Sequence, residues 1–212
     1  GQQCTVRRTG EALARFVEPP RPLFEHRRHP HCEEYGHYLS AAVPRVSEQT
    51  IAWVLAAGPR GGVDVEARAI EGPAGGVQVR VGDAVDTIAL GGDGTVEAGA
   101  ISLAGAAAMV RDSRAGVHRY ALVEGTALAL GSADLIASDV PVGAGAVVGE
   151  KLLRASITCS EPASVTLHCP VQPDMVRLTG IDAPVDVSFH EEAGMVTLGL
   201  PEGSYRLEVR EL

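Results

Sequence analysis

Along most of the chain, apolar and polar residues alternate with a period of two in short runs. In "VDVEARA" (63–69) the valines and alanines alternate with Asp64, Glu66 and Arg68, and "SYRLEVR" (204–210) follows the same pattern. This is the period of a β-strand, whose successive side chains point to opposite faces. Turn residues separate the runs at intervals of roughly 8–12 residues, as in sandwiches and barrels. The pattern predicts an all-β protein, namely an antiparallel β-sandwich with a smaller C-terminal β-unit.

Changes in composition predict three segments. Residues 1–34 are expected to be an N-terminal lead-in, mostly loop, in which "GEALARFVE" (10–18) could form one or two helical turns although the helical signal is weak. Residues 35–150 are expected to form the antiparallel β-sandwich, and residues 151–212 the small C-terminal β-unit. The glycine-rich passage "VPVGAGAVVGE" (140–150) marks the predicted boundary between the last two segments.

Two of the four cysteines lie in neighbouring predicted strands. Cys159 ends "LLRASITC", Cys169 ends "SVTLHC", and "EPAS" between them is typical of a hairpin turn. A hairpin register would place both sulfurs on one apolar face as diagonal neighbours. We expect two buried thiols, with a disulfide as the alternative. No CxxC spacing occurs, so no zinc knuckle or thioredoxin-type motif is indicated.

The charge balance excludes several partner classes. The formal net charge is −9 and the sequence pI is about 5.2, so we expect neither nucleic acid nor an anionic membrane surface as a partner. No apolar run approaches the roughly 20 residues needed to cross a bilayer. The opening "GQQCTVRRTG" lacks the apolar core of a signal peptide, as a processed chain also would. Lys151 is the only lysine among 18 basic residues, a bias that indicates a GC-rich bacterial genome.

The stretch "HRRHPHCEEYGH" (26–37) concentrates candidate chemistry. One interpretation is an exposed loop that leads into a strand, since Pro30 cannot donate to a sheet ladder. A second is a zinc site, because His29, His31 and Glu33 would share one face of an extended chain. Successive residues on that face are roughly 6–7 Å apart, so only neighbouring ones can reach one ion.

A third interpretation of the same stretch is a sugar-binding strip. Arginine, histidine and tyrosine side chains suit an anionic uronate, through charged hydrogen bonds and ring contacts. The candidate glycan-binding residues are Arg27, Arg28, His31 and Tyr35. No residue of the chain is predicted to be catalytic.

Three longer segments carry a family resemblance. They are "EEYGHYLSAAVPRVSEQTIAWVLAAGPRG" (33–61), "VRVGDAVDTIALGGDG" (79–94) and "VHRYALVEGTALALGSADLIAS" (117–138). Their order is similar to the late β-sandwich of the heparinase II/III-like polysaccharide lyases. The closing "VRLTGIDAPVDVSFHEEAGMVTLGLPEGSYRLEVREL" (176–212) resembles the terminal β-appendage of carbohydrate-active enzymes.

The resemblance implies that this chain is a non-catalytic C-terminal portion of such an enzyme. The family's catalytic tyrosine and its partners belong to a helical toroid and a "HGH"-type strand, neither of which this sequence contains. The implied partners are an acidic polysaccharide and the missing helical region, in a bacterial periplasmic or secreted protein. The alternatives are a stand-alone structural or carbohydrate-binding module, which could form homo-oligomers through an edge strand, and a zinc-binding module. Otherwise no cofactor is expected.

Overall fold

The computed structural model describes residues 65–70, 75–92, 94–180 and 194–212 in full. Six further segments are described only by the backbone path of their strands, which are β1 to β5 and β16. The chain forms two compact units, Gly1–Ala69 and Ile70–Leu212, and each is considered by itself.

The first unit contains short antiparallel pairings. Strands β1, β2 and β5 form one sheet, and β3 and β4 pair separately. β2 occupies the segment in which helical turns were expected, so that local prediction was wrong. The strands of this unit are β1 (Gln3–Arg7), β2 (Glu11–Glu18), β3 (Leu23–Arg28), β4 (His37–Ala42), β5 (Ala52–Gly58) and β6 (Val65–Ala69).

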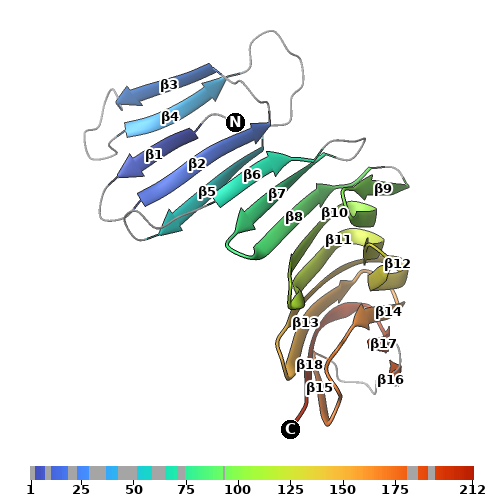
Figure 1. Cartoon of the computed structure of the whole chain (residues 1–212). Helices are drawn as coiled ribbons and strands as arrows, with labels where there is room; N and C mark the ends of the chain where they lie inside the picture. Colours follow the sequence, from blue (N-terminus) through green and yellow to red (C-terminus); the bar gives the residue numbers. More distant parts are fainter. Residues whose placement is uncertain are drawn as a thin grey trace. The chain divides into compact units, whose positions relative to one another are not determined.

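The second unit is one continuous antiparallel sheet that contains every strand from β7 to β18 (Figure 1). The predicted all-β, antiparallel class is therefore confirmed. Its first strands are β7 (Gly76–Val81), β8 (Ala84–Leu90), β9 (Thr95–Ala98), β10 (Ile101–Ser113), β11 (Gly116–Leu130) and β12 (Ala133–Val148). Its last strands are β13 (Leu152–Cys159), β14 (Ala163–His168), β15 (Met175–Thr179), β16 (Asp186–His190), β17 (Met195–Leu200) and β18 (Gly203–Arg210).

Three long strands, β10, β11 and β12, divide this sheet into two arms. Their halves at 107–113, 116–123 and 142–148 continue into β8 and β7 on one side and into β13, β18 and β15 on the other; we call this arm A. Their other halves continue into β9 on one side and into β14, β17 and β16 on the other; we call this arm B.

A bend separates the two arms where the three long strands change register. The ladder shifts at Gly105 and Gly125, and Glu124 next to them has a left-handed φ of 46°. A Cβ on Gly125 would lie 2.5 Å from the Ala104 carbonyl oxygen and 2.8 Å from the Cα of Gly105. Glycine is therefore required here because two backbones approach more closely than any side chain permits.

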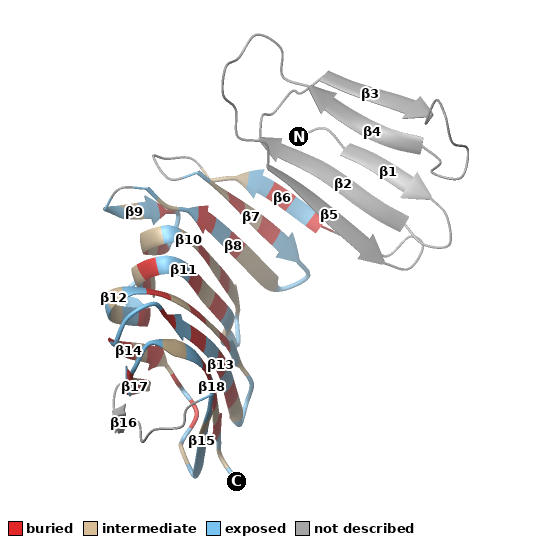
Figure 2. Cartoon of the chain, turned by 180° about the vertical axis from the view of Figure 1, so that it is seen from behind, coloured by how far each residue is buried: buried red, intermediate tan, exposed pale blue. Residues whose placement is uncertain are grey.

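The buried faces of both arms form one hydrophobic core. Figure 2 shows the alternation of buried and exposed positions along these strands. The Tyr120 hydroxyl of arm A donates a 2.5 Å hydrogen bond to the His168 carbonyl oxygen at the end of arm B. The facing inner rows are Val110, Tyr120, Ala146, Ala155 and Leu207 in arm A, and Leu103, Leu128, Ile136, Leu167 and Val196 in arm B.

The compact units differ from the predicted segments. β1, β2 and β3 occupy much of the lead-in that was expected to be mostly loop over 1–34. The boundary expected at 150 is bridged by the pairing of β12 with β13. The glycine-rich composition of 140–150 predicted a linker, but most of this passage lies in β12, where its glycines alternate with the buried Ala144 and Ala146. Small residues here preserve the strand period instead of ending it.

The cysteines confirm one prediction and correct another. Cys159 and Cys169 are both buried, free thiols, and burial raises the pKa of each. Their strands do not form the expected hairpin, because β13 pairs with β12 and β18 while β14 pairs with β12 and β17. β12 is 16 residues long, and a different part of it pairs with each of these two strands. The described part of the chain contains no long apolar helix of the kind that crosses a bilayer.

Candidate functional site

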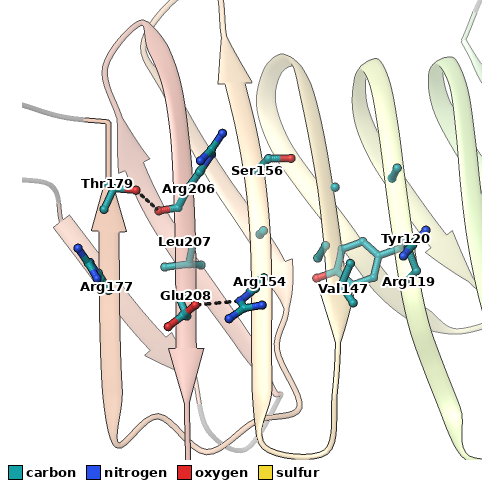
Figure 3. A pocket seen from close by; sticks show the side chains of 14 residues that line it. Arg119, Tyr120, Val147, Arg154, Ser156, Arg177, Thr179, Arg206, Leu207 and Glu208 are labelled. Atoms are coloured by element: carbon teal, nitrogen blue, oxygen red, sulfur yellow. Dashed lines mark hydrogen bonds and ion pairs between the residues drawn. The ribbon is translucent and has the colours of Figure 1, made fainter.

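The outer face of arm A carries a groove of about 620 Å³ that crosses five strands (Figure 3). β11, β12, β13, β18 and β15 each contribute outward-facing residues to it. Its charged side chains are four arginines and one glutamate, namely Arg119, Arg154, Arg177, Arg206 and Glu208. This local excess of positive charge contrasts with the formal net charge of −9 of the whole chain.

Strand register aligns these residues into two rows. In the first row, Arg119, Val147, Arg154, Glu208 and Arg177 lie directly opposite one another on successive strands. Residues paired in this way project from the same face of a sheet and have neighbouring Cβ atoms.

The second row is displaced from the first by two residues on each strand. It consists of Ala121, Gly145, Ser156, Arg206 and Thr179, so Arg206 is its only charged member. The small residues at the β11 and β12 positions leave the groove open, while Ser156 and Thr179 flank Arg206 with hydroxyl groups.

Glu208 is held between two arginines. Its carboxylate accepts hydrogen bonds from Arg154 Nε at 2.9 Å and from Arg210 Nε at 2.7 Å. These hydrogen bonds, that from Arg154 first, hold the pKa of Glu208 below its usual range. By contrast, Arg119, Arg177 and Arg206 make no ion pair with any residue in the described ranges. Three guanidinium groups therefore remain available to an anionic ligand.

The residues that line this groove contain few groups that transfer protons. They include no histidine, cysteine or aspartate, and the single carboxylate is already paired. Tyr120 contributes to the lining, but its hydroxyl reaches through the core to the His168 carbonyl oxygen. No aromatic ring is therefore presented for stacking against a nucleobase, which the binding of single-stranded nucleic acid uses.

A second hollow of about 500 Å³ lies beside the β10–β11 turn and includes His118, Glu150 and His168. The His118 ring is hydrogen bonded to Ser113 Oγ at 2.6 Å, and the same oxygen accepts the Ala115 backbone N–H at 3.1 Å. These two hydrogen bonds connect residues of the same turn to one another and stabilise it. Burial lowers the pKa of His168, so its ring is neutral near pH 7. We assign this cluster a structural role.

The site residues predicted from the sequence belong to a different part of the chain. Arg27 and Arg28 end β3, which is described by its backbone alone, while His29, His31, Glu33 and Tyr35 lie outside the described residues. The glycan-binding and zinc-binding interpretations of this stretch therefore stay predictions. Within the ranges described in full, no group of three or more His, Cys, Asp or Glu side chains could hold a metal ion.

The groove itself was not predicted, although the sequence carries a signal for it. Its four arginines each directly precede a residue that faces the core side of the sheet, as in "RY" (119–120), "RA" (154–155), "RL" (177–178) and "RL" (206–207). Read singly, each is an ordinary exposed strand position. Only the pairing of β13 with β18, and of β18 with β15, brings three of them onto one surface.

No protein-family model matches the sequence, and no curated protein does. Among solved structures, the chain is similar to the catalytic module of a family 98 glycoside hydrolase from Streptococcus pneumoniae TIGR4, with 9% identity and a TM-score of 0.29. The match covers 71% of this chain and 30% of that one. A likeness of this size supports no statement about fold or activity.

Proposed function

We propose that this chain is a non-catalytic β-region that binds an acidic polysaccharide along the groove of arm A. One observation carries the proposal: four arginines and one glutamate line a groove on the outer face of a strongly acidic chain. A net charge of −9 repels polyanions at long range, so a cationic groove on such a chain favours recognition at one place.

The chemistry of the groove suits carboxylate or sulfate groups. A guanidinium group is planar and offers paired donors, which match the two oxygens of an acidic substituent. Arg154 uses one such donor, its Nε, toward Glu208, and Arg119, Arg177 and Arg206, which make no ion pair within the described ranges, can offer paired donors to a ligand. The contacts are exposed to solvent, so we expect added salt to weaken binding.

The resemblance to heparinase II/III-like lyases gives the proposal its specific form. In that form the chain is a C-terminal portion, the elimination chemistry belongs to a helical region elsewhere in the protein, and the arm A groove extends the path of the substrate. A fold can be shared without its activity, so the chain described here is proposed to do no chemistry alone. A stand-alone carbohydrate-binding module would use the same groove.

The test is a binding measurement with an acidic and a neutral polysaccharide. We expect the chain to bind hyaluronan and not dextran, and the triple variant Arg119→Ala, Arg154→Ala, Arg177→Ala to bind at least about tenfold more weakly. The control is Arg114→Ala, which removes an exposed arginine from the β10–β11 turn outside the groove. Unchanged affinity in the triple variant, or tighter binding of single-stranded DNA than of hyaluronan, would contradict the proposal.

A second candidate function is self-association through β15. This strand ends the pairing order of arm A and exposes Met175 and Val176 at 37% and 38%. Strand edges with apolar residues are templates for pairing with another chain. Sedimentation should then show a dimer that Val176→Lys dissociates, whereas a wild-type monomer at high concentration would exclude this function.

A further inference from the structure

We infer that the groove of arm A selects a polysaccharide that carries an anionic group on alternate sugars and lies across the strands. This inference rests on the proposed function, since it names the kind of acidic polysaccharide that the same groove takes.

Across the five strands of the groove, positive side chains in the first row alternate with neutral or negative ones. Arg119 is positive, Val147 neutral, Arg154 positive, Glu208 negative and Arg177 positive, on β11, β12, β13, β18 and β15 in turn. Neighbouring strands lie roughly 4.8 Å apart, so the guanidinium groups recur about every 10 Å across the sheet. Figure 3 shows these side chains on the successive strands.

This repeat matches a polymer with one acidic group per disaccharide. An extended disaccharide is close in length to two strand spacings, so successive acidic groups can reach Arg119, Arg154 and Arg177 together. The intervening neutral sugars would then lie over Val147 and Glu208. Val147 is 47% exposed and offers an apolar contact, while Glu208 can accept hydrogen bonds from sugar hydroxyls.

A polymer with an acid on every sugar fits the same row poorly. Such a chain would place a carboxylate against Glu208, whose pKa is held below its usual range and which therefore stays ionised near pH 7. Like charges held close together repel each other. Its next carboxylate would lie over Val147, which offers no hydrogen-bond donor from its side chain.

The direction of the ligand follows from the same side chains. Along β18, Arg206, Glu208 and Arg210 alternate in sign, and along β13 Arg154 is followed on the same face by Ser156 and Thr158. No single strand among the five in the groove therefore presents two cations at neighbouring positions. Only a path across the strands meets several arginines in one line.

The test compares the binding of two polymers at equal carboxylate concentration and ionic strength. Hyaluronan carries an acid on alternate sugars, and polygalacturonate carries one on every sugar. We expect the wild-type chain to prefer hyaluronan at least fivefold. The double variant Val147→Arg, Glu208→Gln fills the gap in the row and removes the repulsion, so it should bind polygalacturonate more tightly than the wild type does and lose the preference.

The control is Thr197→Arg on the outer face of arm B, which adds a cation outside the groove. It should retain the wild-type preference, and thermal unfolding should confirm that each variant is folded. If the wild type binds both polymers equally or prefers polygalacturonate, this inference fails while the proposed function stands. If it binds neither polymer, the proposed function fails as well.

Discussion

The outer faces of the two arms differ in chemistry although they share one core and one sheet. The outer row of arm A contains arginines, a glutamate and an aspartate, while the corresponding row of arm B is uncharged. From β8 onward the arm A row is Asp86, Arg111, Arg119, Val147, Arg154, Glu208 and Arg177, and the arm B row is Thr95, Ala104, Ala127, Ala137, Thr166 and Thr197.

The inner rows of the same arms show the opposite behaviour. Both are apolar and nearly inaccessible, because they pack against each other and a polar group there would have to find a partner. The outer rows face water, where substitutions change the free energy of unfolding little. This fold therefore constrains one side of each strand and leaves the other side free to acquire a binding surface.

The largest effect is expected at the bend, on which both arms depend. A valine in place of Gly125 would place its Cβ 2.5 Å from the Ala104 carbonyl oxygen. Because backbone atoms cannot move aside as a flexible side chain can, we expect Gly125→Val to lower the free energy of unfolding by at least about 3 kcal/mol. Chemical denaturation measures this change.

The control for Gly125→Val is Gly92→Ala, where an added Cβ would meet nothing within 4 Å. We expect this variant to unfold at the same denaturant concentration as the wild type. If Gly125→Val unfolds there too, the two arms do not depend on a close backbone approach at the bend.

The second effect is alkaline destabilisation of the shared core. Burial raises the pKa of Cys159, Cys169 and Tyr120 in the folded chain. As the pH rises above the ordinary pKa values, about 9 for the thiols and about 10 for the tyrosine, the unfolded chain loses these protons first and binds fewer than the folded chain. The free energy of unfolding should therefore fall by up to about 1.4 kcal/mol per pH unit for each such group.

Denaturation at pH 7.5 and at pH 10 tests this prediction. The double variant Cys159→Ala, Cys169→Ala should show a shallower fall between the two pH values, because only Tyr120 then remains of the three groups. Equal slopes for the variant and the wild type would show that the thiols do not contribute to the pH dependence.

A third effect concerns the link between the arms. Tyr120→Phe removes the hydrogen bond from arm A to the His168 carbonyl oxygen in arm B, and we expect a loss of about 1–2 kcal/mol. Tyr205→Phe is the matched variant, since its hydroxyl donates only to carbonyl oxygens of Pro201 and Glu202 in the adjacent turn. Its loss should be smaller, and equal losses would contradict a special role for the inter-arm bond.

The smallest effects are expected on the two outer rows. In arm B, Thr166 and Thr197 share a 2.9 Å hydrogen bond, and Thr197→Val should cost about 0.5 kcal/mol. In arm A, Glu208→Gln should leave the denaturation midpoint unchanged, because exposed ion pairs contribute little to stability. A clear loss of stability in Glu208→Gln would mean that the arm A row is part of what holds the sheet together.

Much of the strand content could be predicted from local alternation. Segments such as 203–210 and 175–179 are strands as expected, and the cysteines are buried thiols as expected. The predicted hairpin of β13 and β14 was wrong, although a short turn joins the two strands. Each of them pairs instead with a different part of the long strand β12. The boundary predicted at the glycine-rich passage was also wrong, because composition alone does not distinguish a linker from a strand of small residues.

The groove of arm A is the part that no local pattern could supply. Arg154 and Glu208 are 54 residues apart, yet they are direct partners across two strands. Which residues of each strand face the core can be predicted from the amino-acid pattern, because it depends on a period of two within a few residues. Which strands are neighbours, and in what register, is set by contacts between distant segments in the folded chain. The chain has many apolar strands of similar length, so the local pattern does not show which of them pair. The three arginines, which come from distant segments, share one row because of the pairing that forms.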